Sequence, residues 1–161
     1  MKTKTQQRES IQARAFSLNR ILVPLDFSGK SRQALEFAVP LAKQYGAKIF
    51  LIHVVEPVYN YPPYPGGIGA SMVKPNPLAE VAKDTLSTMA AELVPPELLG
   101  KLLVRVGSAY DEIVNAAEEL DADLIALTTH GRTGLKHALL GSTAERVVRH
   151  AHCAVLAVRR H

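Results

Sequence analysis

The chain has 161 residues, 47% of them hydrophobic and 21% charged, which is the length and composition of one globular domain and excludes a disordered protein. No apolar run approaches the roughly 20 residues that a membrane span needs, so we expect no membrane association. The formal net charge of +4 arises in residues 1–20, which hold five basic residues and one acidic residue. The rest of the chain has 14 basic and 14 acidic residues and is formally neutral. We therefore expect no nucleic-acid-binding surface on the domain.

Residues 1–19 form a basic N-terminal tail that we expect to be flexible, and residues 20–161 form the predicted domain. The tail lacks the apolar segment of a secretory signal. Cys153 is the only cysteine, so the chain has no internal disulfide, and a lone thiol fits a reducing compartment. We therefore expect a cytoplasmic protein.

The first predicted strand covers Ile21 to Leu25 and is followed by Asp26. Apolar residues then recur at helical spacing over residues 30–45, and this pattern stops at a glycine. Pro40 lies inside the predicted helix and is expected to bend it, because proline removes one backbone donor. A second strand is predicted over residues 48–55, which are largely β-branched and apolar.

Residues 57–77 are rich in proline, glycine and tyrosine, which excludes a helix or an ordinary strand. A loop this long inside a compact domain is usually functional or mobile. Two interpretations remain open for it. It is either a mobile lid over a bound ligand or a disordered insertion without a role of its own.

Strands and helices alternate along the whole chain. This order predicts an α/β fold, a single-domain doubly wound sheet of five parallel strands with helices on both faces. Such sheets bind ligands at the carboxyl ends of their strands, where the winding reverses. The remaining predicted elements are helices over residues 78–93 and 108–120 and strands over residues 102–106, 124–127 and 153–158.

A polar, glycine-containing loop separates the fourth predicted strand from a helix that begins at Ser142. Ser142 and Glu145 have the spacing of a capping box, as do Ser108 and Asp111 at the preceding helix. Gly141 permits positive φ and a close approach of the backbone to a ligand. A helix N-terminus behind such a loop is a natural anion site. Plain turn chemistry explains the same residues equally well, so both interpretations stay open.

Asp26 ends an apolar strand, where its carboxylate could accept hydrogen bonds from a ligand. It could instead cap the following helix. Because Ser28 is also available as that cap, the ligand interpretation is favoured.

His150, His152 and Cys153 lie close together in the sequence and raise the question of a metal site. Consecutive residues entering a strand alternate between its faces, and no second ligand cluster exists, so we expect no metal here. The Walker A, GxSxG and HExxH motifs are all missing from the sequence. We therefore predict no catalytic residue.

The segment from Thr129 to Val158 resembles the C-terminal signature of the universal stress protein family: Thr-His-Gly, nine residues, Gly-Ser, a helix and the terminal strand CAVLAV. ATP-binding members carry Gly, two residues, Gly, nine residues, Gly, then Ser or Thr. Gly131 and Gly141 match the second and third of these glycines, whereas Thr128 stands in place of the first. The resemblance covers residues 20–159, including the strands in ILVPLDFS and IFLIHVVEP.

The resemblance implies a Rossmann-like fold of the adenine nucleotide alpha hydrolase type, with the first and fourth strands adjacent. It implies ATP, with or without Mg²⁺, as a regulatory ligand in a stress response, with little or no hydrolysis. It also implies a homodimer through Ala154–Val158, and an apolar edge strand favours such pairing independently. The nucleotide contacts expected by match to the family are Pro24, Leu25, Asp26, Val54, Leu127, Thr128, His130, Gly131, Arg132, Gly141, Ser142 and Thr143.

Two alternatives to a nucleotide-binding regulator remain open. Thr128 and the tyrosine-rich loop motivate a dimeric protein-interaction module of the same fold that binds no nucleotide. The other alternative is a slow ATPase or an autophosphorylating enzyme. The lack of an evident general base in the sequence argues against this alternative. The sequence identifies no protein partner beyond a second copy of the chain.

Overall fold

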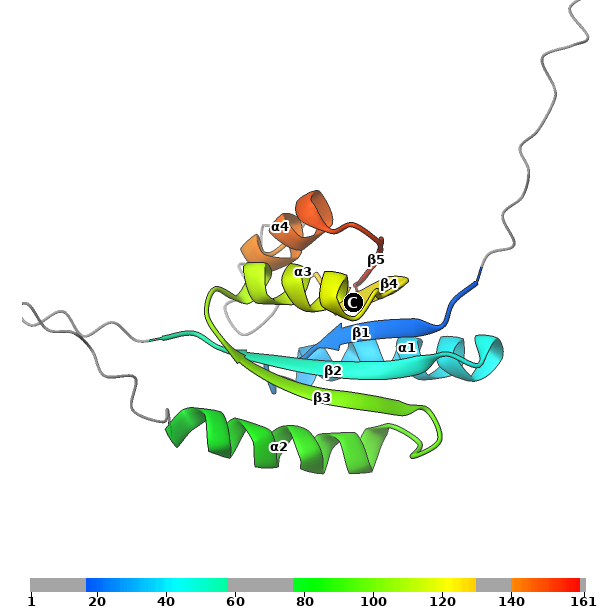
Figure 1. Cartoon of the computed structure of the whole chain (residues 1–161), viewed down its shortest axis with the longest axis horizontal. Helices are drawn as coiled ribbons and strands as arrows, with labels where there is room; N and C mark the ends of the chain where they lie inside the picture. Colours follow the sequence, from blue (N-terminus) through cyan, green and yellow to red (C-terminus); the bar gives the residue numbers. More distant parts are fainter. Residues whose placement is uncertain (1–16, 58–76, 130–139, 160–161) are drawn as a thin grey trace, which may run out of the picture.

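Helices and strands alternate along the chain and build a parallel sheet with helices on both faces (Figure 1). The structure is a computed structural model and describes residues 17–57, 77–129 and 140–159. Its elements are β1 (Arg20–Pro24), α1 (Gly29–Tyr45), β2 (Lys48–Val55), α2 (Pro77–Leu93), β3 (Leu99–Val106), α3 (Ala109–Glu119), β4 (Leu124–Thr128), α4 (Ser142–His150) and β5 (Ala154–Val158). The five strands are parallel and lie in the order β3-β2-β1-β4-β5, which confirms the predicted fold class.

The central strand β1 divides the core into two layers. Ile21 and Val23 pack on one face with residues of α1 and α2, whereas Leu22 packs on the other with residues of α3 and α4. Figure 1 shows α2 below the strands and α3 and α4 above them. β1 pairs with β2 on one side and with β4 on the other, so the winding of the sheet reverses between β1 and β4. This reversal is where a doubly wound sheet offers a ligand site.

Helix α1 has clear signals at both ends. Ser28 is its N-cap, and the side chain of Ser28 accepts a hydrogen bond from the backbone N–H of Ser31 at 3.2 Å. Gly46 ends the helix in the left-handed region, at φ 71°, and donates its N–H to the carbonyl oxygen of Ala42. The helix continues through Pro40, which is exposed. The predicted end at Gly46 is confirmed.

Strand β3 begins at Leu99, three residues before the predicted start at Leu102. The sequence places Gly100 in this segment, and a glycine usually weakens a strand. Here the glycine is favoured by packing, because a Cβ at Gly100 would lie 2.9 Å from Cε1 of the Phe50 ring on β2 and the ring would have to shift. Leu99 pairs with Ile49, and the register shifts before Leu51 pairs with Leu102, so a local irregularity absorbs the extra residue.

Neither predicted capping box forms. Ser108 is the N-cap of α3 but makes no side-chain hydrogen bond to the helix, and Asp111 hydrogen-bonds to the side chain of Tyr110 instead. At α4 the N-cap is Gly141, so Ser142 is already the first helical residue. The carboxylate of Glu145 lies 2.8 Å from the guanidinium of Arg149, one turn along the same helix. The helix starts were predicted correctly, but the side-chain contacts were not.

The packed chain begins before β1, because the side chain of Leu18 is only 3% exposed and belongs to the core cluster under α1 and α2. The predicted flexible tail (residues 1–19) and mobile loop (residues 57–77) lie outside the described residues, except for residues 17–19, Pro57 and Pro77, and Pro77 already belongs to α2. Within the described ranges, no helix is long and apolar enough to cross a bilayer.

Candidate functional site

The carboxyl ends of β1 and β4 bring the predicted site residues to one edge of the sheet. The two strands are adjacent and parallel, so Asp26, which follows β1, and Thr128, which ends β4, lie at the same edge. β2 ends there too, since Pro24 pairs with Ile52 and the N–H of Leu25 donates to the carbonyl oxygen of Ile52 at 2.8 Å. The predicted adjacency of Asp26 and the loop after β4 is therefore confirmed at the level of the strands.

A backbone hydrogen bond places α4 at this edge. The N–H of Gly141 donates to the carbonyl oxygen of Thr129 at 2.6 Å, and the N–H of Thr129 donates to Val158 at 3.0 Å. Thr129 and Gly141 therefore lie next to each other, immediately after β4. The first turn of α4, with its unpaired N–H groups and partial positive charge, consequently lies beside the end of β4.

Gly141 does not have the positive φ that the sequence suggested. Its φ is −70° and its ψ is 156°, an extended conformation that any residue can adopt. Thr128 is an ordinary strand residue, and only Phe27 and Asp121 have positive φ among the described residues other than glycine. The threonine therefore fits the backbone at the position where the family pattern has its first glycine.

Asp26 shapes the turn between β1 and α1. Its Oδ1 atom accepts hydrogen bonds from the backbone N–H of Ser28, at 2.9 Å, and from the Ser28 hydroxyl. Ser28 in turn caps α1, so the capping role weighed for Asp26 belongs to Ser28. Asp26 is partly exposed, and the two hydrogen bonds from Ser28 hold its carboxylate in place. This arrangement presents a negative charge of defined position at the sheet edge.

His53 also holds this turn, and the sequence analysis did not select it. Its Nδ1 atom lies 2.7 Å from the carbonyl oxygen of Leu25, and its ring stacks on Phe27 with the ring centroids 3.9 Å apart. Phe27 has φ 63°, a left-handed conformation that costs on the order of 1 kcal/mol for a residue other than glycine. The available signal was a single polar side chain in the otherwise apolar second half of β2.

On the face of the sheet that α3 and α4 cover, the side chain of Arg146 packs on an aromatic ring. Val54 and Tyr110 pack against the core cluster of α3 and α4. The guanidinium of Arg146 on α4 lies 4.3 Å from the centroid of the Tyr110 ring. The hydrogen bond with Asp111 raises the pKa of Tyr110 above its usual range, so the phenol stays neutral. Neither Tyr110 nor Arg146 was expected at the site from the sequence.

A comparison with known families decides what kind of domain presents this edge. The family model described as the universal stress protein family matches residues 17–159. The chain belongs to the universal stress protein family.

Several relatives are similar over nearly their full length. This universal stress protein is 35% identical over 145 residues to universal stress protein MJ0531 of Methanocaldococcus jannaschii, a match that covers 88% of this chain and 82% of the relative. The solved structure of MJ0577 from the same organism has a TM-score of 0.71 and 28% identity, and the match covers 91% of this chain and 99% of that one. A universal stress protein from Archaeoglobus fulgidus, solved in complex with dAMP, has a TM-score of 0.60 and 26% identity, over 88% of this chain and 98% of that one.

The predicted contact residues of this universal stress protein fall into three groups. Leu25 and Leu127 are buried, with 3% and 5% of their surface exposed. Asp26, Val54, Thr128, Gly141, Ser142 and Thr143, together with Pro24, are partly or fully exposed at the edge. His130, Gly131 and Arg132 lie outside the described residues.

The residues considered for a metal site do not converge. His152 lies 4.0 Å from Glu118, and the ring of His150 lies beside Tyr110. Partial burial raises the pKa of the Cys153 thiol, so the thiol less readily forms the thiolate that would bind a metal ion. Within the described part of the chain, no three His, Cys, Asp or Glu side chains are grouped so that they could hold a metal ion.

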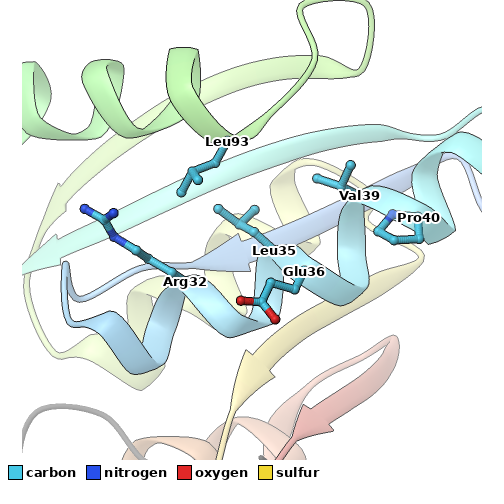
Figure 2. A pocket seen from close by; sticks show the side chains of 6 residues that line it. All are labelled: Arg32, Leu35, Glu36, Val39, Pro40 and Leu93. Atoms are coloured by element: carbon cyan, nitrogen blue, oxygen red, sulfur yellow. The ribbon is translucent and has the colours of Figure 1, made fainter.

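A surface groove lies between α1 and α2, on a helical face rather than at the strand ends (Figure 2). None of the predicted contact residues lines it. The lining residues are Arg32, Leu35, Glu36, Val39 and Pro40 of α1 and Leu93 of α2.

Proposed function

We propose that this universal stress protein binds an adenine nucleotide, ATP, as a regulatory ligand in a stress response. The observation that carries the proposal is the hydrogen bond from Gly141 to Thr129, because it sets the N-terminus of α4 beside the carboxyl ends of β1 and β4. Helix N-termini at this place in doubly wound sheets bind phosphate groups. The relative from Archaeoglobus fulgidus that binds dAMP has the same fold, which supports an adenine nucleotide as the ligand.

Each part of the nucleotide has a matching group at this edge. The N–H groups of Ser142 and Thr143 would receive phosphate oxygens, and the carboxylate of Asp26 would accept hydrogen bonds from ribose hydroxyls. Backbone atoms near Leu25 and Val54 would contact the adenine. His130, Gly131 and Arg132 complete the proposed phosphate site by their match to the family pattern.

Magnesium, where present, would arrive with the nucleotide. Mg²⁺ is commonly held by phosphate oxygens, waters and one or two protein carboxylates. The described residues offer no cluster of three protein ligands, and one oxygen of Asp26 already accepts two hydrogen bonds from Ser28. The residues therefore fit a metal that is coordinated mainly by the phosphates.

We propose binding with little or no hydrolysis. Hydrolysis needs a base within hydrogen-bonding reach of the attacking water. Asp26 is the carboxylate that the described part of the site offers, and its Oδ1 atom already accepts two hydrogen bonds from Ser28, which leaves that oxygen poorly placed to take a proton from water. A sensor that reports nucleotide occupancy fits these residues better than an enzyme does.

Dimerisation through β5 is the second part of the proposal. β5 is an edge strand of the sheet, with β4 as its one partner strand among the described residues, and the side chains of Ala154 and Ala157 are exposed. Apolar side chains on the two flanking helices are exposed as well, Phe37 of α1 at 44% and Val148 of α4 at 47%. An edge strand with small exposed side chains and apolar flanks suits pairing with a second copy.

One experiment tests the nucleotide proposal without any substitution. Freshly purified protein is denatured, and the released small molecules are separated by chromatography and compared with adenine nucleotide standards. Released ATP in an amount comparable to the protein supports the proposal. Protein that releases no nucleotide and binds none at millimolar ATP with magnesium would favour the alternative, a dimeric interaction module of the same fold.

The cytoplasmic location belongs to the same proposal. The single thiol of Cys153 fits a reducing compartment, where ATP is also available.

A further inference from the structure

The turn that carries Asp26 is held from the neighbouring strand by one histidine. The Nδ1 atom of His53 lies 2.7 Å from the carbonyl oxygen of Leu25, the residue before Asp26. The ring of the same histidine stacks on Phe27, the residue after Asp26, with an interplanar angle of 15°. His53 therefore contacts the chain on both sides of the proposed ribose-binding carboxylate.

The turn needs such support because its backbone is strained. Phe27 adopts φ 63°, which is rare for a bulky residue. Strained conformations of this kind persist only where the surroundings hold them, and they concentrate at ligand sites. The hydrogen bonds from Ser28 to Asp26 support the turn along the chain, and His53 supports it across the sheet.

The hydrogen bond also fixes the chemical form of the ring. A carbonyl oxygen only accepts, so the Nδ1 atom of His53 must carry the proton. Neutral His53 is therefore the Nδ1–H tautomer, with Nε2 unprotonated. Packing alone would not require a histidine at this position. On the same face of β2, the apolar residues Ile49 and Leu51 fill the core.

We propose that His53 is a positioning residue for the nucleotide: by donating from Nδ1 to the carbonyl oxygen of Leu25, it holds Asp26 where the ligand is bound. This inference rests on the proposed nucleotide function. It adds a residue on β2 that contacts the Asp26 turn.

Two substitutions separate the donor from the ring. His53→Asn places an amide N–H close to the position of Nδ1 and loses the ring, whereas His53→Phe keeps a stacking ring and loses the donor. His152→Phe is the matched control, because His152 is exposed and its recorded contact is with Glu118. Each protein is titrated with ATP by calorimetry, and the ring tautomer of His53 and the exchange rate of the Ser28 amide are measured by NMR without nucleotide.

We expect His53→Phe to weaken ATP binding about tenfold, in line with the loss of one hydrogen bond, and to speed exchange of the Ser28 amide by a similar factor. His53→Asn should stay within about threefold of the unsubstituted protein, and His152→Phe should change neither quantity. Equal ATP affinity of His53→Phe and the unsubstituted protein would overturn the proposal, as would an Nε2–H tautomer.

The NMR measurements keep this inference distinguishable from the proposed function. If the unsubstituted protein binds no ATP, the nucleotide function fails, and the claim that His53 holds the turn is then decided by the tautomer and the Ser28 exchange rate. Unchanged exchange in His53→Phe would reject that claim as well. Faster exchange would still show that His53 holds the turn, and the turn would then belong to a site for another ligand.

Discussion

The backbone N–H of Gly141 donates a 2.6 Å hydrogen bond to the carbonyl oxygen of Thr129. This bond joins the start of α4 to the end of β4. Gly141 forms it with φ −70°, in a conformation that requires no glycine. The close approach of a ligand to the backbone is one physical reason for a glycine here, and it is the one that the proposed function implies.

Gly141→Ala should therefore affect ligand affinity and leave stability unchanged. Alanine accepts the observed φ and keeps the N–H that bonds to Thr129, so the free energy of unfolding should change by less than about 0.5 kcal/mol. The added Cβ would obstruct the approach of the phosphates, and we expect ATP affinity to fall about tenfold or more. Denaturant unfolding and ATP titration measure the two effects.

Gly46→Ala is the matched control for that substitution. Gly46 has φ 71° at the end of α1, so alanine there should lower the free energy of unfolding by about 1 kcal/mol without changing ATP affinity. Equal ATP affinity of Gly141→Ala and the unsubstituted protein would show that no ligand approaches this glycine.

Substitutions of Asp26 should separate its charge from its role in the turn. Asn keeps an oxygen that accepts from Ser28, so Asp26→Asn should unfold with nearly unchanged free energy but bind ATP about tenfold more weakly. Asp26→Ala removes the acceptor and should cost about 1 to 2 kcal/mol of stability in addition. ATP affinity that survives in Asp26→Asn would mean that the carboxylate serves the turn alone.

Gly100→Ala tests the packing that lengthens β3. The new Cβ would lie 2.9 Å from the Phe50 ring, so we expect a loss of about 1 to 3 kcal/mol in the free energy of unfolding. Gly29→Ala, at the start of α1, adds a Cβ with no heavy atom within 4 Å and should be neutral or slightly stabilising. Combining Gly100→Ala with Phe50→Leu should recover part of the loss, and a fully additive loss would contradict the contact.

A charge on β5 should disrupt the proposed dimer. The side chain of Ala157 is exposed on the edge strand, and Ala157→Lys places an ammonium group in the pairing surface. We expect light scattering after size exclusion to give twice the monomer mass for the unsubstituted protein and the monomer mass for the variant. Asn115→Lys on the exposed side of α3 is the control and should leave the mass unchanged.

The fold followed from the sequence because the periodicity of the apolar residues is strong and local. The adjacency of β1 and β4 did not follow from that periodicity, since it joins residues about a hundred positions apart, as in the pair Ile21 and Leu124. It was implied by the family resemblance, and the structure confirms it. Gly100 shows the same limit on a smaller scale. It is a weak strand residue by itself and one that packing favours beneath Phe50.

The site was predicted in part, for physical reasons that particular residues make clear. Asp26 stood out as a carboxylate after an apolar strand, but its hydrogen bonds with Ser28 depend on the geometry of the turn. His53 was not selected because its partners, Leu25 and Phe27, lie on another strand and its turn. The capping-box pattern at Ser142 and Glu145 was misleading, because the helix begins one residue earlier than the pattern requires and Glu145 pairs with Arg149.

The central claim is that the edge formed by Asp26, Gly141 and α4 binds ATP. Calorimetric titration of nucleotide-free protein with ATP, in the presence of magnesium, tests it most directly. We expect saturable binding in the micromolar range with one nucleotide per chain, and weaker binding in Asp26→Asn and Gly141→Ala. No saturable heat up to millimolar ATP would contradict the claim.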